Sequence, residues 1–132
     1  MAVPTVKGRN TFSHPVWLTE LQSDVRGLVR WDDVTLQLYS TAACFFEITP
    51  LAVIIPEDLD DIRATLRICN RHRIPILPRG AGSSLSGNAV GEAVIIDLTH
   101  HFKDIEALDD ERLRCGVSVV LNQLQDRLKD QH

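Results

Sequence analysis

A glycine- and serine-rich run that follows the apolar stretch 74–77 is the part of this chain best suited to chemistry. The run 78–91 holds four glycines and three serines in fourteen residues. Glycine adopts positive φ easily and lets backbone N–H groups approach a ligand closely. Several N–H groups around one concavity bind an anion such as a pyrophosphate, and serine hydroxyls are further donors. The run therefore indicates a nucleotide site, with an ordinary surface connection as the alternative.

The glycine spacing matches neither of two familiar phosphate-binding loops. The dinucleotide fingerprint G-x-G-x-x-G needs a glycine where Leu85 stands. The P-loop pattern fits Gly82 and Gly87, but Asn88 stands where its lysine should be. Both patterns also open a helix, whereas this run leads into 93–98, which predicts a strand.

Length and composition are those of one ordinary globular domain. The chain has 132 residues, of which 44% are hydrophobic and 24% charged. The net charge of -4 gives no basic surface that would favour nucleic acid. The three cysteines form no zinc pattern and are interpreted as free thiols in a reducing compartment, and no metal site is predicted. No apolar run reaches the length of a signal core or a transmembrane helix, so we expect a cytoplasmic protein.

Apolar periodicity predicts alternating helices and strands around the glycine-rich run. The clearest helix begins at Asp58, a good N-cap, with Asp61 in a capping-box-like position. Its apolar stripe is expected to comprise Leu59, Ile62, Leu66 and Cys69. The other predicted elements are a helix over 16–30 that bends or ends at Gly27, helical turns over 32–39, strands over 51–55, 74–77, 93–98, 105–108 and 113–115, and a final helix over 117–129.

The order of these elements predicts an α+β fold, or α/β-like fold, with a small mixed sheet and flanking helices. The strand–helix–strand start over 51–77 needs a crossover and predicts parallel pairing of its two strands. No glycine or proline stop follows the final helix, so we expect a chain truncated at its C-terminal end. We divide it into an N-terminal segment, 1–21, and a lobe, 22–132.

Three segments occur in an order that is typical of one family. They are 38–42 leading to 50–56, the run 78–90 leading to 94–98, and 115–117. Together they resemble FAD-linked oxidases of the p-cresol methylhydroxylase or vanillyl-alcohol oxidase type. The resemblance is strongest to the branch with the glycolate oxidase FAD subunit and D-lactate dehydrogenases. It implies the first lobe of that type of FAD-binding domain, over about residues 22–129.

The resemblance also implies how FAD would be held. The segment that matches 79–84 wraps the pyrophosphate in that family, through N–H groups and hydroxyls. Ser83 stands where some relatives attach the flavin through a histidine, which implies non-covalent FAD. A surface ion pair is the alternative role for Arg79. The implied cofactor-binding residues are Pro78, Arg79, Gly80, Ala81, Gly82, Ser83, Ser84, Gly87, Asn88 and Gly116.

The parent enzyme implied by the resemblance oxidises a small 2-hydroxy acid, of the glycolate or D-lactate type, by hydride transfer to FAD. Its other parts would be the second half of the FAD domain, a substrate-binding cap domain and an iron–sulfur module or subunit. The catalytic residues of relatives lie in those parts, so none is assigned here and the chain alone is expected to be inactive. Asp97, beside the loop, is interpreted as a turn or capping residue rather than an acid or base.

Two other functions remain open at this stage. The first is a non-catalytic module that dimerises or binds a partner through apolar surface and retains no flavin. The second is a related flavin reductase of cell-wall precursor synthesis, which shares this type of lobe.

Overall fold

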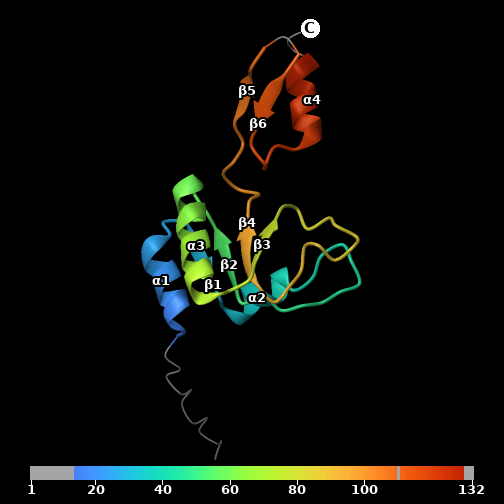
Figure 1. Ribbon diagram of the computed structural model, residues 1–132. Coiled ribbons are helices and arrows are strands. Elements are labelled where there is room, and N and C mark those ends of the chain that lie inside the picture. The colour runs from blue at the N-terminus through green and yellow to red at the C-terminus, as the bar shows by residue number, and fades with distance from the viewer. Residues whose placement is uncertain (1–13, 110, 130–132) are drawn as a thin grey trace, which may run out of the picture.

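The computed structural model describes residues 14–109 and 111–129, which form a four-stranded sheet with helices and a smaller hairpin unit (Figure 1). The elements in chain order are α1 (Val16–Asp24), β1 (Leu28–Arg30), α2 (Asp33–Tyr39), β2 (Ala52–Ile55), α3 (Leu59–His72), β3 (Ile76–Arg79), β4 (Val94–Asp97), β5 (Ile105–Ala107), β6 (Leu113–Cys115) and α4 (Leu121–Lys129). Within these ranges no helix is long and apolar enough to cross a membrane.

The larger sheet has the strand order β1-β2-β4-β3, and it is mixed as the sequence predicts. β4 runs parallel to both β2 and β3, while β1 is antiparallel to β2. The predicted direct pairing of β2 with β3 is therefore wrong, because β4 lies between them. Every residue of β4 is buried, which suits a central strand, whereas Pro78 has no N–H to donate and so favours an edge position for β3.

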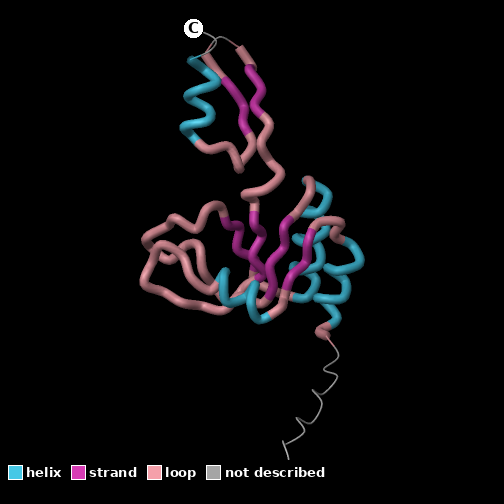
Figure 2. Tube along the Cα trace, turned by 180° about the vertical axis from the view of Figure 1, so that it is seen from behind, coloured by secondary structure: helices cyan, strands magenta, loops and turns pink. Residues whose placement is uncertain are grey.

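The main core lies between the sheet and the helices α1 and α3, which pack side by side against it (Figures 1 and 2). Its fully buried members include Leu21 of α1, Ile68 of α3 and Ile54 of β2. The two long loops, 40–51 and 80–93, lie on the other side of the sheet. The core therefore leaves these loops free to form a surface of their own.

The predicted apolar stripe of α3 is wrong except at Cys69. Leu59 and Leu66 are 57% and 46% exposed, and the helix instead buries Asp61, Ala64, Thr65, Ile68 and Cys69. Two polar side chains are tolerated on this face because both are hydrogen-bonded. Asp61 accepts backbone N–H groups, and the Thr65 hydroxyl donates to the Asp61 carbonyl oxygen at 2.8 Å.

Two predicted helices are shorter than expected. The helix predicted over 16–30 ends at Asp24, and the residues from Leu28 to Arg30 form β1 because they pair with β2. The final helix begins at Leu121 rather than at 117. The segment before it makes a turn in which the Val119 amide donates to the Gly116 carbonyl oxygen at 3.2 Å.

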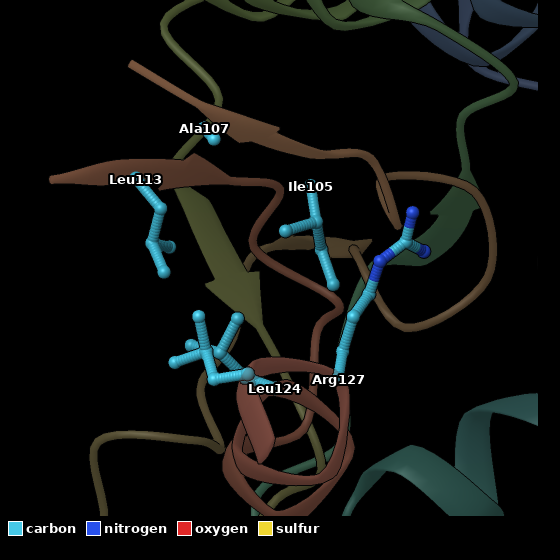
Figure 3. A pocket seen from close by; sticks show the side chains of 6 residues that line it. Ile105, Ala107, Leu113, Leu124 and Arg127 are labelled. Carbon is cyan, nitrogen blue, oxygen red and sulfur yellow. The ribbon is translucent and has the colours of Figure 1, made fainter. Parts of the chain in front are cut away.

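β5, β6 and α4 form a separate small unit beyond the end of β4 (Figure 1). α4 buries none of its residues, and Val117, Val120 and Leu121 are more than half exposed. Side chains of the hairpin and of α4 face one another across a cavity of about 210 Å³ (Figure 3). Its lining comprises Ile105, Ala107, Leu113, Leu124, Arg127 and Leu128. Two strands and one helix provide little burial on their own.

Candidate cofactor-binding site

Two loops lie side by side and support each other across the larger sheet from α1 and α3. Loop 40–51 connects α2 to β2, and loop 80–93 connects β3 to β4. The Ala43 amide donates to the Gly82 carbonyl oxygen at 2.9 Å, which joins the loops in their first halves. Phe46 packs against Gly87, where an added Cβ would lie 2.7 Å from the ring. The predicted site is therefore supported by loop 40–51, which carries none of the predicted site residues.

The backbone conformation requires glycine at some positions of the run but not at others. Gly82 and Gly87 have φ of +68° and +84°, in the region that side chains rarely adopt. Gly80 has no positive φ, and a Cβ there would meet nothing within 4 Å. The chain itself therefore requires glycine at 82 and 87 but not at 80.

The backbone amides of loop 80–93 mostly lack acceptors in the described part of the protein. Among the residues that the structure describes, no backbone N–H from Gly80 to Ala89 donates to another group of the protein. The first bonded amide is that of Val90, which donates to the Gly87 carbonyl oxygen at 3.4 Å. The described part of the fold therefore does not use these donors, as a phosphate-binding loop requires; Gly82 and Ala89 are buried residues, and the others are exposed or half-exposed.

Arg79, the last residue of β3, is half-buried and its guanidinium binds backbone carbonyl oxygens. Nη1 donates to Tyr39 and to Ala89, both at 3.0 Å, and Nη2 donates to Thr41 at 2.9 Å. The guanidinium carbon also lies 5.0 Å from the centre of the Tyr39 ring, in cation–π contact. In the described part of the chain no carboxylate forms an ion pair with Arg79; its guanidinium is instead bonded to the three carbonyl oxygens.

Asp97 ends β4 and is 5% exposed. Its carboxylate accepts hydrogen bonds from the Tyr39 hydroxyl at 2.5 Å, the Thr99 amide at 2.8 Å and the Thr99 hydroxyl at 2.7 Å. Burial opposes ionisation, but the bonds from Thr99 and Tyr39 outweigh it, so the pKa of Asp97 lies below its ordinary value. The predicted turn role is confirmed by the Thr99 bonds, and the bond to Tyr39 is an addition that sequence reasoning missed.

The remaining predicted residues lie in different surroundings. Ser83 and Asn88 are exposed and Ser84 is half-exposed, so their polar groups are open to a ligand. Gly116 belongs to the hairpin unit, and its amide donates to the Asp104 carbonyl oxygen at 2.8 Å. A Cβ on Gly116 would lie 2.2 Å from the Phe102 carbonyl oxygen, so the fold itself accounts for this glycine.

Comparison with known proteins decides the family. The family described as FAD binding domain matches residues 50–132, which is more than half of the chain. The chain belongs to this FAD-binding family. Its cofactor is FAD, as the resemblance implied.

Curated relatives of this FAD-binding chain are oxidoreductases of 2-hydroxy acids by name. It is 38% identical over 73 residues to glycolate oxidase subunit GlcD of Bacillus subtilis, a match covering 54% of this chain and 16% of that protein. It is 26% identical over 123 residues to D-2-hydroxyglutarate dehydrogenase of Pseudomonas putida, a match covering 89% of this chain and 12% of that protein. A third relative is D-lactate dehydrogenase of Archaeoglobus fulgidus, with 37% identity over 76 residues, a match covering 56% of this chain and 17% of that protein. The chain thus spans under a fifth of each relative.

Solved structures with the same fold include two enzymes. One is p-cresol methylhydroxylase with substrate bound, with a TM-score of 0.66, 19% identity and coverage of 87% of this chain and 24% of that chain. The other is alkyldihydroxyacetonephosphate synthase, with a TM-score of 0.75, 14% identity and coverage of 91% and 25%. At these identities the likeness concerns the fold, and it confirms the predicted p-cresol methylhydroxylase-type lobe.

Proposed function

We propose that this chain holds the pyrophosphate part of FAD in the loop 78–88, within a flavin-dependent oxidoreductase. The observation that carries this proposal is the row of free amides from Gly80 to Ala89, beside the positive φ of Gly82. Free N–H groups in a glycine-rich loop fit the negative oxygens of a diphosphate. When bound, FAD supplies the acceptor for a hydride, and the protein contributes its placement and electrostatic surroundings.

Each predicted residue has a role in this proposal. Gly80 and Gly82 let the backbone approach the phosphates, with Ala81 between them, and the hydroxyls of Ser83 and Ser84 donate to phosphate oxygens. Pro78 and Arg79 shape the start of the loop. Gly87 and Asn88 face the ribityl side, and Gly116 approaches the cofactor from the hairpin unit. Because position 83 is serine rather than histidine, this lobe binds FAD non-covalently.

The substrate we propose for the complete enzyme is a small 2-hydroxy acid. Glycolate, D-lactate and D-2-hydroxyglutarate appear in the names of the curated relatives, and all three are acids of this class. The rest of the FAD domain, a cap domain and an iron–sulfur module or subunit belong to the same proposal. All three cysteines are free thiols, which supports a reducing, cytoplasmic location.

The alternative of an interaction module is favoured by the apolar side chains left exposed. Phe45 is fully exposed, and Leu85 and Val117 are 77% and 69% exposed. Apolar side chains in such positions are typical of surfaces that a partner covers. The two functions differ in one respect, since only the FAD-binding function needs the free amides of the loop.

Gly80→Val tests the site because the fold leaves room for this side chain but a bound pyrophosphate would not. We expect the free energy of unfolding to change by no more than about 0.5 kcal/mol, as for other open surface sites. FAD affinity, measured by flavin fluorescence titration, should fall by roughly tenfold or more, which corresponds to about 1.4 kcal/mol of lost binding.

Ser86→Val is the matched control, because it places the same side chain on an exposed position of the same loop. It should bind FAD as the wild type does. Wild-type affinity in Gly80→Val would place the pyrophosphate elsewhere. A colourless wild-type protein that ignores added FAD would favour the interaction module.

A further inference from the structure

The guanidinium of Arg79 joins both ends of the glycine-rich loop to the neighbouring loop. It binds Ala89 near the end of loop 80–93, Tyr39 at the end of α2 and Thr41 at the start of loop 40–51. These contacts use three of the five N–H donors of arginine. The fork geometry of the group lets it hold several carbonyl oxygens at fixed angles, which an ammonium group does not.

The guanidinium also determines the space inside the loop. A Cβ on Gly82 would lie 2.7 Å from Nη2 of Arg79, so the guanidinium packs directly against the Gly82 backbone. The carbonyl oxygen of Gly82 in turn accepts the Ala43 amide from the second loop. The conformation of the loop at Gly82 therefore depends on two contacts, the packing of the Arg79 guanidinium and the hydrogen bond from the Ala43 amide.

The ring of Tyr39 supports the guanidinium of Arg79. Arg79 and Asp97 are register partners on the adjacent strands β3 and β4, so their side chains share one face of the sheet. They do not pair with each other; Asp97 binds the Tyr39 hydroxyl and Arg79 lies over the Tyr39 ring. A tyrosine held at its hydroxyl end by a buried carboxylate presents its ring in one orientation.

We propose that Arg79, seated on Tyr39, is a positioning residue that shapes loops 40–51 and 80–93 for FAD, rather than a cation that neutralises phosphate. This inference rests on the proposed function, because it assigns how that loop is held. The geometry supports it in two ways: the donors of Arg79 point to carbonyl oxygens of the protein, and these oxygens come from three separate backbone positions.

Lysine and glutamine at position 79 separate positioning from charge. Lysine keeps the positive charge but lacks the planar fork, whereas glutamine loses the charge as well. If Arg79 acts by shaping the loops, Arg79→Lys and Arg79→Gln lower FAD affinity to a similar extent. A loss of roughly tenfold or more is expected for each, as for removal of one hydrogen bond from a charged group.

Hydrogen exchange of the Ala43 amide in the full chain without FAD provides a readout independent of binding. This amide bonds to Gly82 and reports whether the two loops remain joined. Its exchange should accelerate by roughly tenfold or more in both Arg79 variants. Exchange of the buried β2 amides of Val53 and Ile54 should stay at the wild-type rate, which shows that the sheet remains folded.

Arg63→Gln is the control for the loss of one arginine charge, since Arg63 lies exposed on α3 and pairs with Asp60 at 2.7 Å. It should change neither the Ala43 exchange nor the FAD affinity. Wild-type exchange of Ala43 in Arg79→Gln would overturn the inference, and so would wild-type FAD affinity in Arg79→Lys. If the wild-type chain binds no FAD, the proposed function fails, and the exchange of Ala43 still decides whether Arg79 holds the loops.

Discussion

The backbone amide of Gly27 donates a 3.0 Å hydrogen bond to the carboxylate of Asp61, which lies on the first turn of α3. The amides of Arg26 and Glu57 bind the same carboxylate at 3.0 and 2.9 Å, and Asp61 is 1% exposed. A Cβ on Gly27 would lie 2.1 Å from the Ile55 carbonyl oxygen. Asp61 thus ties the turn between α1 and β1 to the first turn of α3.

Asp61→Asn should destabilise the fold. Burial opposes ionisation of Asp61, but the amide donors outweigh it and its pKa lies below the ordinary value. Asparagine has one acceptor oxygen, and its NH₂ group would face backbone N–H donors, so we expect a loss of about 2–4 kcal/mol of unfolding free energy. Urea denaturation measures it. Asp60→Asn is the control, because Asp60 is exposed on the same turn, and it should cost no more than about 1 kcal/mol.

The pH dependence of the Asp61 contribution follows from the direction of its pKa. A carboxylate whose pKa is lower in the folded state contributes stability above its unfolded pKa of about 3.9 and loses it as pH falls through the folded value. The stability difference between wild type and Asp61→Asn should therefore stay constant above about pH 5 and shrink below about pH 4. A difference that grew on acidification would contradict this assignment.

Tyr39 is the only tyrosine of the chain, so tyrosinate absorbance reports this residue alone. Burial, then the hydrogen bond to Asp97 and its charge, raises the pKa of Tyr39 to about 12. A group with a raised folded pKa stabilises the fold fully below its unfolded pKa, about 10 for tyrosine, and loses that contribution as pH rises through the folded value. The contribution of Tyr39 should therefore disappear between about pH 10 and 12.

Spectrophotometric titration of Asp97→Asn provides the matched comparison for Tyr39. Removing the negative charge takes away one cause of the raised pKa, so the absorbance midpoint should move from about 12 towards 10. The urea-denatured wild type should titrate near 10. A folded wild-type protein with its midpoint near 10 would show that the Tyr39–Asp97 contact is absent in solution.

Gly82→Val should impair both the fold of the loop and FAD uptake. A β-branched residue is strained at φ of +68°, and its Cβ would collide with the Arg79 guanidinium. We expect a loss of about 1–3 kcal/mol in unfolding free energy, the usual cost of such backbone strain. FAD uptake is expected to be lost as well. Gly80→Val introduces the same side chain two residues earlier without strain, so equal stability of the two variants would argue against the loop conformation described here.

Several elements could be predicted from sequence because their signals are local. The cap at Asp58, the apolar runs of β2 and β4 and the glycine-rich loop each lie within a few neighbouring residues, and all occur in the structure close to their predicted bounds. The segment 25–30 could not be predicted in this way. Its residues are compatible with helical spacing, but β2 and Asp61 hold them in a turn and an edge strand.

The sequence by itself determined the location of the loop, because glycine, serine and apolar residues at fixed spacing are local properties, and its resemblance to known proteins indicated the family and the cofactor class. Tertiary structure decided which side chains hold that loop. Tyr39 and Asp97 are separated by 58 positions, and Arg79 lies 40 positions from Tyr39. Such contacts depend on β4 entering the sheet between β2 and β3, which brings distant segments together and which no local pattern encodes.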